Sequence, residues 1–287
     1  MAFIWGIPYL LIRVAVRDLH PGQIVVLRTL PAALLLLPLV LYRRQFSLIV
    51  KHWRWILAFG VVEFGIPWYC MSTAEEHLTS SFTSLVICGV PLIAIFAGRF
   101  TSAHEKLSKR RIAGLAIGAV GVGLLVGLDL GHGGVASILL LVVVCVGYAL
   151  GPLVLQTKLT DVPGPAIVCG ATGMVALAWL PYFVTHLPRH VNSETWQSVA
   201  VLSVICTAVA FLVFFALVKE AGSGRSLVVV YSNTAIAILL GVVFLHEPLT
   251  VGIVLGFPLI VAGSYLGTTA TRGSGDAGVD SYLFIDD

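Results

Sequence analysis

A short phrase occurs twice in this chain, each time between two long apolar runs. It reads His104-Glu105-Lys106-Leu107 in its first copy and, 142 residues later, His246-Glu247-Pro248-Leu249 in its second. The same offset relates Pro21-Gly22 to Pro163-Gly164 and Gly121 to Gly263. One constant offset across 287 residues indicates that the chain is a duplicated half. Internal duplication in a very hydrophobic chain is typical of transporters.

The composition restricts the chain to one broad class. Hydrophobic residues make up 58% of the sequence, charged residues 11%, and the mean hydropathy is +1.00. Soluble domains carry about a quarter charged residues. The sequence therefore predicts an integral membrane protein in contact with the lipid bilayer, with no sign of a nucleic-acid partner. Its 5 cysteines form no CxxC pair, so we expect no metal and no cofactor.

Apolar runs of about 20 residues, the length of one membrane crossing, predict an all-α membrane protein with ten transmembrane helices. We expect spans at residues 2–16, 21–42, 53–73, 80–100, 110–128, 135–157, 164–186, 196–218, 225–245 and 250–270. They form two five-helix units, residues 1–128 and 135–270, followed by a flexible tail at 271–287. The first span is shorter than one crossing, and we expect a truncated start rather than a short helix.

Basic residues determine the predicted orientation. Thirteen Lys and Arg residues lie in the even-numbered loops and the tail, whereas the odd-numbered loops hold only Arg17 and Arg189. By the positive-inside rule, both termini are expected in the cytoplasm, with the chain in the cell membrane. Because each unit has an odd number of spans, the two units should be inverted repeats. Such repeats commonly hold a substrate site near the bilayer midplane, between the halves.

Several residues together resemble the EamA family of the drug/metabolite transporter superfamily. They are Trp5-Gly6, Pro21, Arg28, Pro91 and the two copies of the repeated phrase. The resemblance covers residues 2 to 270 and implies a ten-helix exporter or permease for small metabolites, with a central cavity. One departure is that Asn233 stands at the position matching Pro91.

Two charged residues fall well inside predicted spans. Glu63 lies near the centre of the third span, where it is either a proton-coupling or cation-binding carboxylate, or a packing partner that is hydrogen-bonded or paired with Arg28. Arg28 either attracts an anionic substrate group or has a structural role, paired or reaching the outer headgroups. Arg13, nearer the outer end of the first span, is interpreted as an interfacial anchor.

Aromatic and polar residues in the presumed cavity helices complete the candidate site: Trp5, Tyr9, Trp68, Tyr148, Tyr231, Ser232 and Asn233, with Pro91 added by the family resemblance. Polar atoms inside spans need partners, so some of these side chains are expected to touch substrate. The alternative for each is an interhelical hydrogen bond or a place in the interfacial aromatic belt.

The repeated phrase itself is interpreted as structural. Neither copy has the second histidine of a metalloprotease HExxH motif, while Glu105 and Glu247 suit the capping of a helix N-terminus. Close helix packing is indicated by two groups of glycines, at 114, 118 and 121 and again at 252, 256 and 263. The packing partner is either a helix of the same chain or a second copy in a homodimer.

The leading hypothesis is a secondary active transporter, an exporter of a small metabolite working by alternating access, with proton coupling as an additional expectation. A P-loop for ATP is absent from the sequence. The alternative is an intramembrane enzyme acting on lipid or isoprenoid substrates. Neither paired aspartates within a span nor a GxSxG motif supports an enzyme.

Overall fold

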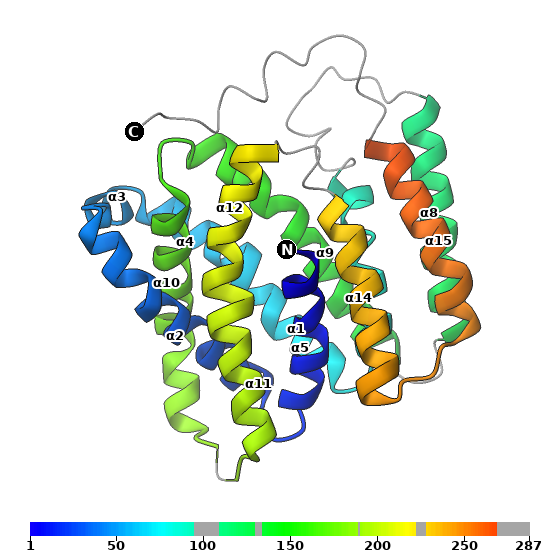
Figure 1. Ribbon diagram of the computed structural model, residues 1–287, viewed down its shortest axis with the longest axis horizontal. Coiled ribbons are helices and arrows are strands. Elements are labelled where there is room, and N and C mark those ends of the chain that lie inside the picture. The colour runs from blue at the N-terminus through cyan, green and yellow to red at the C-terminus, as the bar shows by residue number, and fades with distance from the viewer. Residues whose placement is uncertain (95–108, 130–133, 189, 222–227, 269–287) are drawn as a thin grey trace.

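The computed structural model describes residues 1–94, 109–129, 134–188, 190–221 and 228–268, and within these ranges every regular element is a helix (Figure 1). In the first half these are α1 (Ala2–Ala15), α2 (Pro21–Tyr42), α3 (Phe46–Lys51), α4 (Trp53–Gly60), η1 (Val61–Gly65), α5 (Ile66–Glu75), α6 (Ser80–Ile87) and α8 (Lys109–Asp129). In the second they are α9 (Gly134–Lys158), α10 (Gly164–Thr185), α11 (Ser193–Ser203), η2 (Val204–Val209), α12 (Ala210–Ala221), α14 (Val228–Leu245) and α15 (Val251–Thr268). The all-α prediction is confirmed for the described residues.

The helices have the length and apolarity of a membrane protein. Five are long and apolar enough to cross a membrane: Pro21–Tyr42, Trp53–Glu75, Gly134–Lys158, Gly164–Thr185 and Ser193–Phe215. Shorter apolar helices at Ala2–Ala15, Ser80–Ala94, Ile112–Gly127, Ser232–Leu245 and Val251–Leu266 overlap the other predicted spans.

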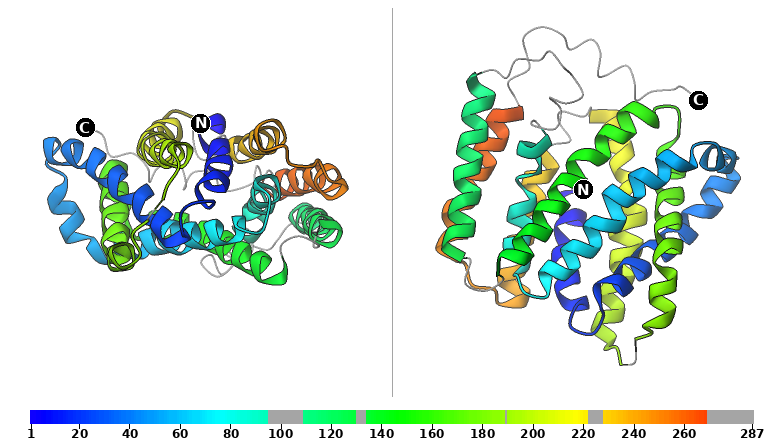
Figure 2. Two further views of the ribbon diagram at one scale, coloured as in Figure 1. Left: turned by 90° about the horizontal axis from the view of Figure 1, so that it is seen from below. Right: turned by 180° about the vertical axis from the view of Figure 1, so that it is seen from behind.

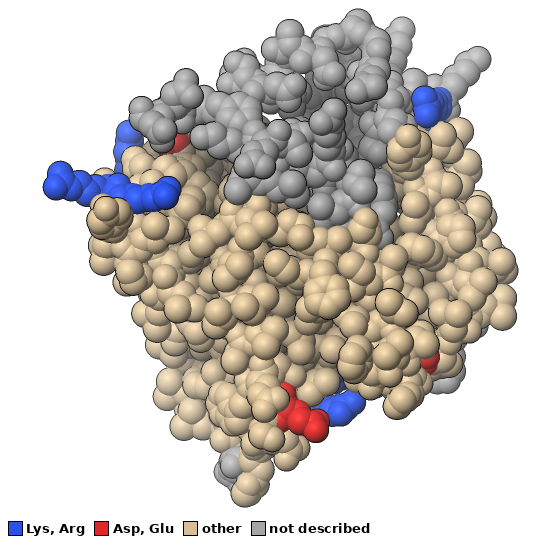
Figure 3. Space-filling model, in the orientation of Figure 1, with Lys and Arg blue, Asp and Glu red and all other residues tan. Residues whose placement is uncertain are grey.

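The outer surface of the bundle is apolar around its middle. Leu34, Leu139 and Leu239 are 58%, 59% and 60% exposed, which suits contact with lipid rather than water. On the face seen in Figure 3, the Lys, Arg, Asp and Glu side chains gather at the upper and lower margins and leave the middle uncharged. The described helices therefore form an integral membrane bundle.

Helices at matching positions of the two halves pack against each other. α2 contacts α10 along its length, and α8 contacts α15 in the same way. In Figure 1, α2 runs upward where α10 runs downward, and α8 runs downward where α15 runs upward. Seen from below, α8 and α15 lie at one end of an elongated bundle, α2 and α3 lie toward the other, and α1 lies between (Figure 2).

Glycines allow the close approach of α8 and α15. A Cβ atom on Gly263 would lie 2.6 Å from the carbonyl oxygen of Gly114, and one on Gly256 would lie 3.0 Å from that of Gly121. Since backbone atoms cannot move aside easily, these positions need glycine. The predicted small-residue faces therefore serve a contact within the chain.

Each half contains a π-helical turn at a comparable place. η1 joins α4 to α5, and η2 joins α11 to α12. In the first case Pro67 lacks the N–H that would pair with the carbonyl of Glu63 in an α-helix, which favours a wider turn. In the second, the hydroxyl of Thr207 donates to the carbonyl of Leu202 at 2.8 Å. Such turns are frequent at functional sites.

Proline also explains why α6 ends early. Pro91 has no N–H to bond the carbonyl of Ile87, and its ring crowds that carbonyl. The helix accordingly stops at Ile87, a turn follows at Cys88 and Gly89, and the amide of Leu92 bonds the carbonyl of Gly89 at 3.0 Å. The matching helix α14, with Asn233 in place of the proline, runs unbroken from Val228 to Leu245.

Candidate functional site

The centre of the candidate site is the guanidinium group of Arg28, on α2. The residue is 5% exposed. Its Nε donates to the hydroxyl of Thr207 at 3.1 Å, and its Cζ lies 3.5 Å from the ring centre of Trp68. A desolvated cation–π contact of this kind contributes about 2 kcal/mol. These two contacts hold the guanidinium while its Nη1 atom stays buried without a hydrogen-bond partner.

The two π-helical turns bring the partners of Arg28 together. Thr207 lies within η2, and Trp68 lies three residues beyond the end of η1. The helix α2 contacts both α5 and η2, so the guanidinium stands where the two halves of the chain meet. The structure thereby brings together two of the predicted site residues, Arg28 and Trp68.

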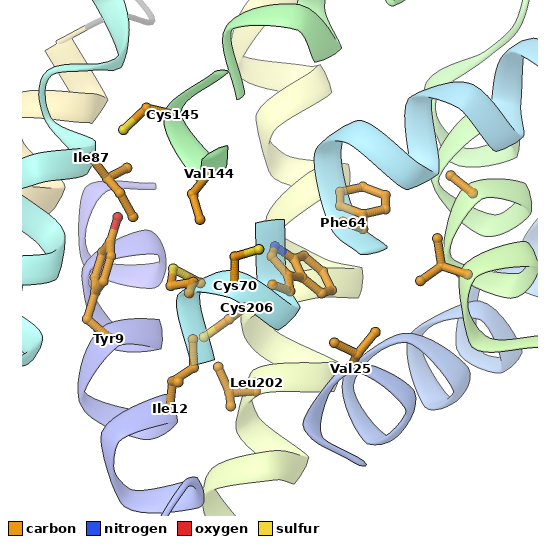
Figure 4. Close-up of a cluster of buried hydrophobic side chains, with 14 of the residues drawn as sticks. Tyr9, Ile12, Val25, Phe64, Cys70, Ile87, Val144, Cys145, Leu202 and Cys206 are labelled. Carbon is orange, nitrogen blue, oxygen red and sulfur yellow. The ribbon is translucent and has the colours of Figure 1, made fainter. Parts of the chain in front are cut away.

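Two further predicted residues lie in the same interior region. Tyr9 of α1 and Tyr148 of α9 are electrostatic neighbours of Arg28, together with Cys206 of η2. Tyr9 is buried and Tyr148 is partly buried. Figure 4 shows the hydroxyl end of Tyr9 directed toward Ile87 in an otherwise apolar cluster. The site thus combines one cation, two phenols and apolar walls from helices of both halves.

Glu75 is a functional candidate that the sequence does not reveal, because it lies between the predicted spans 53–73 and 80–100. It is the last residue of α5, it is fully buried, and neither carboxylate oxygen has a hydrogen-bond partner. Its charged neighbours are Glu247, Arg13 and Arg28. The sequence signal that could have revealed Glu75 is that Arg13 and Arg28 lie inside the outer parts of the first two predicted spans. Buried cations of this kind favour a nearby acid.

Arg13 binds the end of a neighbouring helix. Its Nη1 donates to the carbonyl of Glu75, and to the carbonyl of Glu76 at 3.2 Å. A cation at the last carbonyls of a helix also opposes the negative end of the helix dipole. Arg13 therefore closes the C-terminus of α5, and its place as an interfacial anchor stays a prediction.

Glu63 lies in η1, away from any ion pair with Arg28. Its Oε2 is buried without a hydrogen-bond partner and occupies the space where a side chain at Gly151 of α9 would begin. The carboxylate therefore does not pair with Arg28, which was one form of the expected packing role, and its proton-coupling or cation-binding role stays a prediction. The carboxylate is instead a buried acid packed against a neighbouring helix.

The remaining predicted residues are spread through the bundle. Trp5 packs against Phe211 and Phe214 of α12, with ring centres 5.8 and 4.8 Å apart. The oxygen of the buried Asn233 side chain accepts a hydrogen bond from Thr234 at 3.2 Å, and Pro91 is buried beyond α6. The side chain of Tyr231 lies outside the described residues.

An aromatic row connects Trp5 to the arginine. Phe211 lies 5.3 Å from Phe64, and Phe64 lies 4.9 Å from Trp68, measured between ring centres. Trp68 in turn stacks on Arg28. Although Trp5 does not touch the guanidinium, it belongs to the same apolar wall.

A second feature is an open depression of about 550 Å³ at the lower end of the bundle. It is lined by Asp18, His20, Gln23, Val184, Thr185, His186, Leu187 and Pro188. Asp18 accepts hydrogen bonds from the Thr195 hydroxyl at 2.7 Å and from the Asn192 amide at 3.0 Å. These bonds lower the pKa of Asp18, the one from Thr195 most. They join the loop after α1 to the start of α11.

No group of three or more His, Cys, Asp or Glu side chains among the described residues is arranged to hold a metal ion. All five cysteines are buried and free.

Glu247 caps a helix, as predicted, but the helix belongs to the other half of the chain. Its carboxylate accepts a hydrogen bond from the backbone amide of Ser80 at 2.7 Å, rather than from an amide of its own next helix. Glu105 lies outside the described residues.

Apolar helices packed around buried charged groups define an integral membrane protein, and charges inside such a bundle are common in transporters. The model of the EamA-like transporter family matches residues 1–127 and 135–269, so the chain belongs to that family. The uncharacterized transporter YvbV of Bacillus subtilis is 23% identical over 95% of this chain and 90% of its own length, and YoaV, an uncharacterized transporter of the same organism, is 24% identical over 93% and 94%.

A solved crystal structure supports the fold. It matches with a TM-score of 0.64 at 19% sequence identity, over 93% of this chain and 96% of the other. The family and its relatives indicate a transporter rather than an enzyme.

Proposed function

We propose that the chain is a secondary active transporter that exports a small metabolite across the cell membrane by alternating access. The observation that carries the proposal is the buried Arg28, which lies where α2, α5 and η2 meet and keeps one nitrogen without a partner. Charged side chains inside a membrane bundle are costly, and commonly mark a substrate or ion pathway.

The proposed architecture is two inverted five-helix repeats, residues 1–128 and 135–270, with both termini in the cytoplasm. The opposite courses of α2 and α10, and of α8 and α15, support an inverted relation between the halves (Figure 1). So does the recurrence of a π-helical turn in η1 and η2. In inverted repeats, rocking of one half against the other opens a central site to alternate sides.

Proton coupling belongs to the same proposal, with Glu63 as the coupling carboxylate. Its Oε2 is buried without a hydrogen-bond partner. A carboxylate in this setting can gain or lose a proton when the cavity changes sides.

Counterflow in proteoliposomes tests the transport function. The purified full chain is reconstituted, loaded with unlabelled metabolites, and assayed for entry of the labelled forms, with protein-free liposomes as the control. The panel contains neutral, anionic and cationic metabolites. We expect saturable counterflow of at least one, and faster flux under an imposed pH gradient. Absence of counterflow together with turnover of a lipid or isoprenoid would replace the transporter with the intramembrane enzyme. Uptake into inside-out but not right-side-out vesicles tests the export direction.

A further inference from the structure

We infer that the site around Arg28 recognises a monocarboxylate with an apolar body. This inference rests on the transport function proposed above, because ligand entry requires the halves to separate. The starting point is the guanidinium itself, which is buried and has one nitrogen, Nη1, without a hydrogen-bond partner.

The charge of the site calls for an anion. The guanidinium of Arg28 has two direct contacts, the Thr207 hydroxyl and the Trp68 ring, and both are neutral. Glu75 is a neighbour, but its oxygens form no hydrogen bond to the guanidinium. A buried cation without a paired anion costs several kcal/mol. A carboxylate that accepts from Nη1 would supply both the missing charge and the missing acceptor.

The number of charges favours a monoanion over a phosphate ester. Arg28 contributes one positive charge, and the other nearby arginine, Arg13, is already bonded to the carbonyls of Glu75 and Glu76. A doubly charged phosphate would keep one negative charge that the single free guanidinium does not balance.

The walls of the site favour an apolar body on the ligand. Figure 4 shows Val25, Phe64, Leu202 and Cys206 in one cluster of buried hydrophobic side chains, and Cys206 is also an electrostatic neighbour of Arg28. The aromatic row from Trp5 through Phe211 and Phe64 leads to Trp68. Sugars and other polyhydroxylated ligands would leave their hydroxyls without partners against such walls.

Isothermal titration calorimetry on the purified full chain tests the assignment, with phenylacetate and its neutral analogue phenylacetamide as probes. We expect phenylacetate to bind wild type and phenylacetamide to bind at least about tenfold more weakly, because a charge-assisted hydrogen bond is lost. Arg28→Gln should weaken phenylacetate binding by a similar factor. Arg17→Gln, which removes an exposed arginine, is the matched control and should bind as wild type does. If Arg28→Gln fails to fold, Arg28→Lys should bind phenylacetate with intermediate affinity, because it keeps the charge but loses the planar stack.

Three results would overturn the inference: no phenylacetate binding to wild type, equal binding of the amide, or tighter binding of inorganic phosphate. The readout also separates this inference from the transport proposal. Carboxylate binding without counterflow of any metabolite would remove transport and keep the site. Counterflow of neutral or cationic metabolites without carboxylate binding would remove the carboxylate site and keep the transport function.

Discussion

Glu247 and Ser81 form a double hydrogen bond between the two halves of the chain. The Glu247 carboxylate accepts the backbone N–H of Ser81 at 3.0 Å and its hydroxyl at 2.6 Å. A carboxylate at this place satisfies amides that the first turn of α6 leaves unpaired, and opposes the positive end of the helix dipole. The loop after α14 is thereby attached to the start of α6.

Loss of this carboxylate should destabilise the protein. We expect Glu247→Gln to lower the free energy of unfolding by about 1–3 kcal/mol, because the buried amides of α6 lose a charged acceptor and face an amide NH₂ group. Thermal unfolding in detergent measures the effect. Glu76→Gln, at an exposed position, is the control. Equal unfolding temperatures for the two variants would show that the cap contributes nothing.

Two glycines give a matched test of helix packing. Gly263→Ala places a methyl group against the backbone of α8, so we expect a clear loss of thermal stability. Gly123→Ala has nothing within 4 Å of the new methyl group and should raise stability slightly, since alanine favours a helix by about 1 kcal/mol over glycine. The prediction is contradicted if both substitutions shift the unfolding temperature in the same direction.

Asp18 predicts a defined dependence of stability on acid pH. Its hydrogen bonds hold the pKa in the folded protein below the ordinary value of 3.8. The stabilisation is therefore fully present above pH 3.8 and is lost as the pH falls through the lower, folded-state pKa. We expect wild type to unfold at a higher temperature than Asp18→Asn near neutral pH, and the difference to shrink at acid pH. Asp161→Asn, with an exposed side chain, serves as the control; a constant difference across the pH range would remove Asp18 from this role.

Glu63→Gln tests proton coupling. If this carboxylate carries the coupling proton, the substitution should abolish the acceleration of flux by a pH gradient, while counterflow without a gradient and the yield of folded protein are kept. Glu76→Gln, at an exposed position, is the control and should keep the acceleration of flux by the pH gradient. Gradient-driven flux equal to that of wild type would remove Glu63 from the coupling role.

The helices of the fold could be predicted from the sequence because the length of an apolar run is a local signal. The apolar runs located the helices, and the 142-residue offset between His104 and His246 pointed to two similar units. The glycines of the last span in each unit indicated close packing, and Gly121 and Gly256 indeed meet within the chain.

The site was predicted less completely, because it depends on which helix faces meet. Arg28 and Trp68 were both candidates, but their stacking depends on the packing of α2 against α5. Glu75 was missed because its position at a helix end resembles a loop, and its burial comes from other helices. Arg13 and Glu247 act on partners far away in the chain, which spacing alone does not identify.

The π-helical turn η1 fixes the rotational phase of α5 relative to α4. Its i→i+5 bonds place about one residue more in a helical turn than an α-helix does. Each residue advances an α-helix by about 100°, so winding η1 as a regular α-helix with all of its residues kept would turn α5 by up to roughly that angle. Trp68 would then point away from Arg28, although no side chain of the site had been replaced. The winding of this five-residue segment is therefore as much a part of the Arg28 site as the side chains it orients.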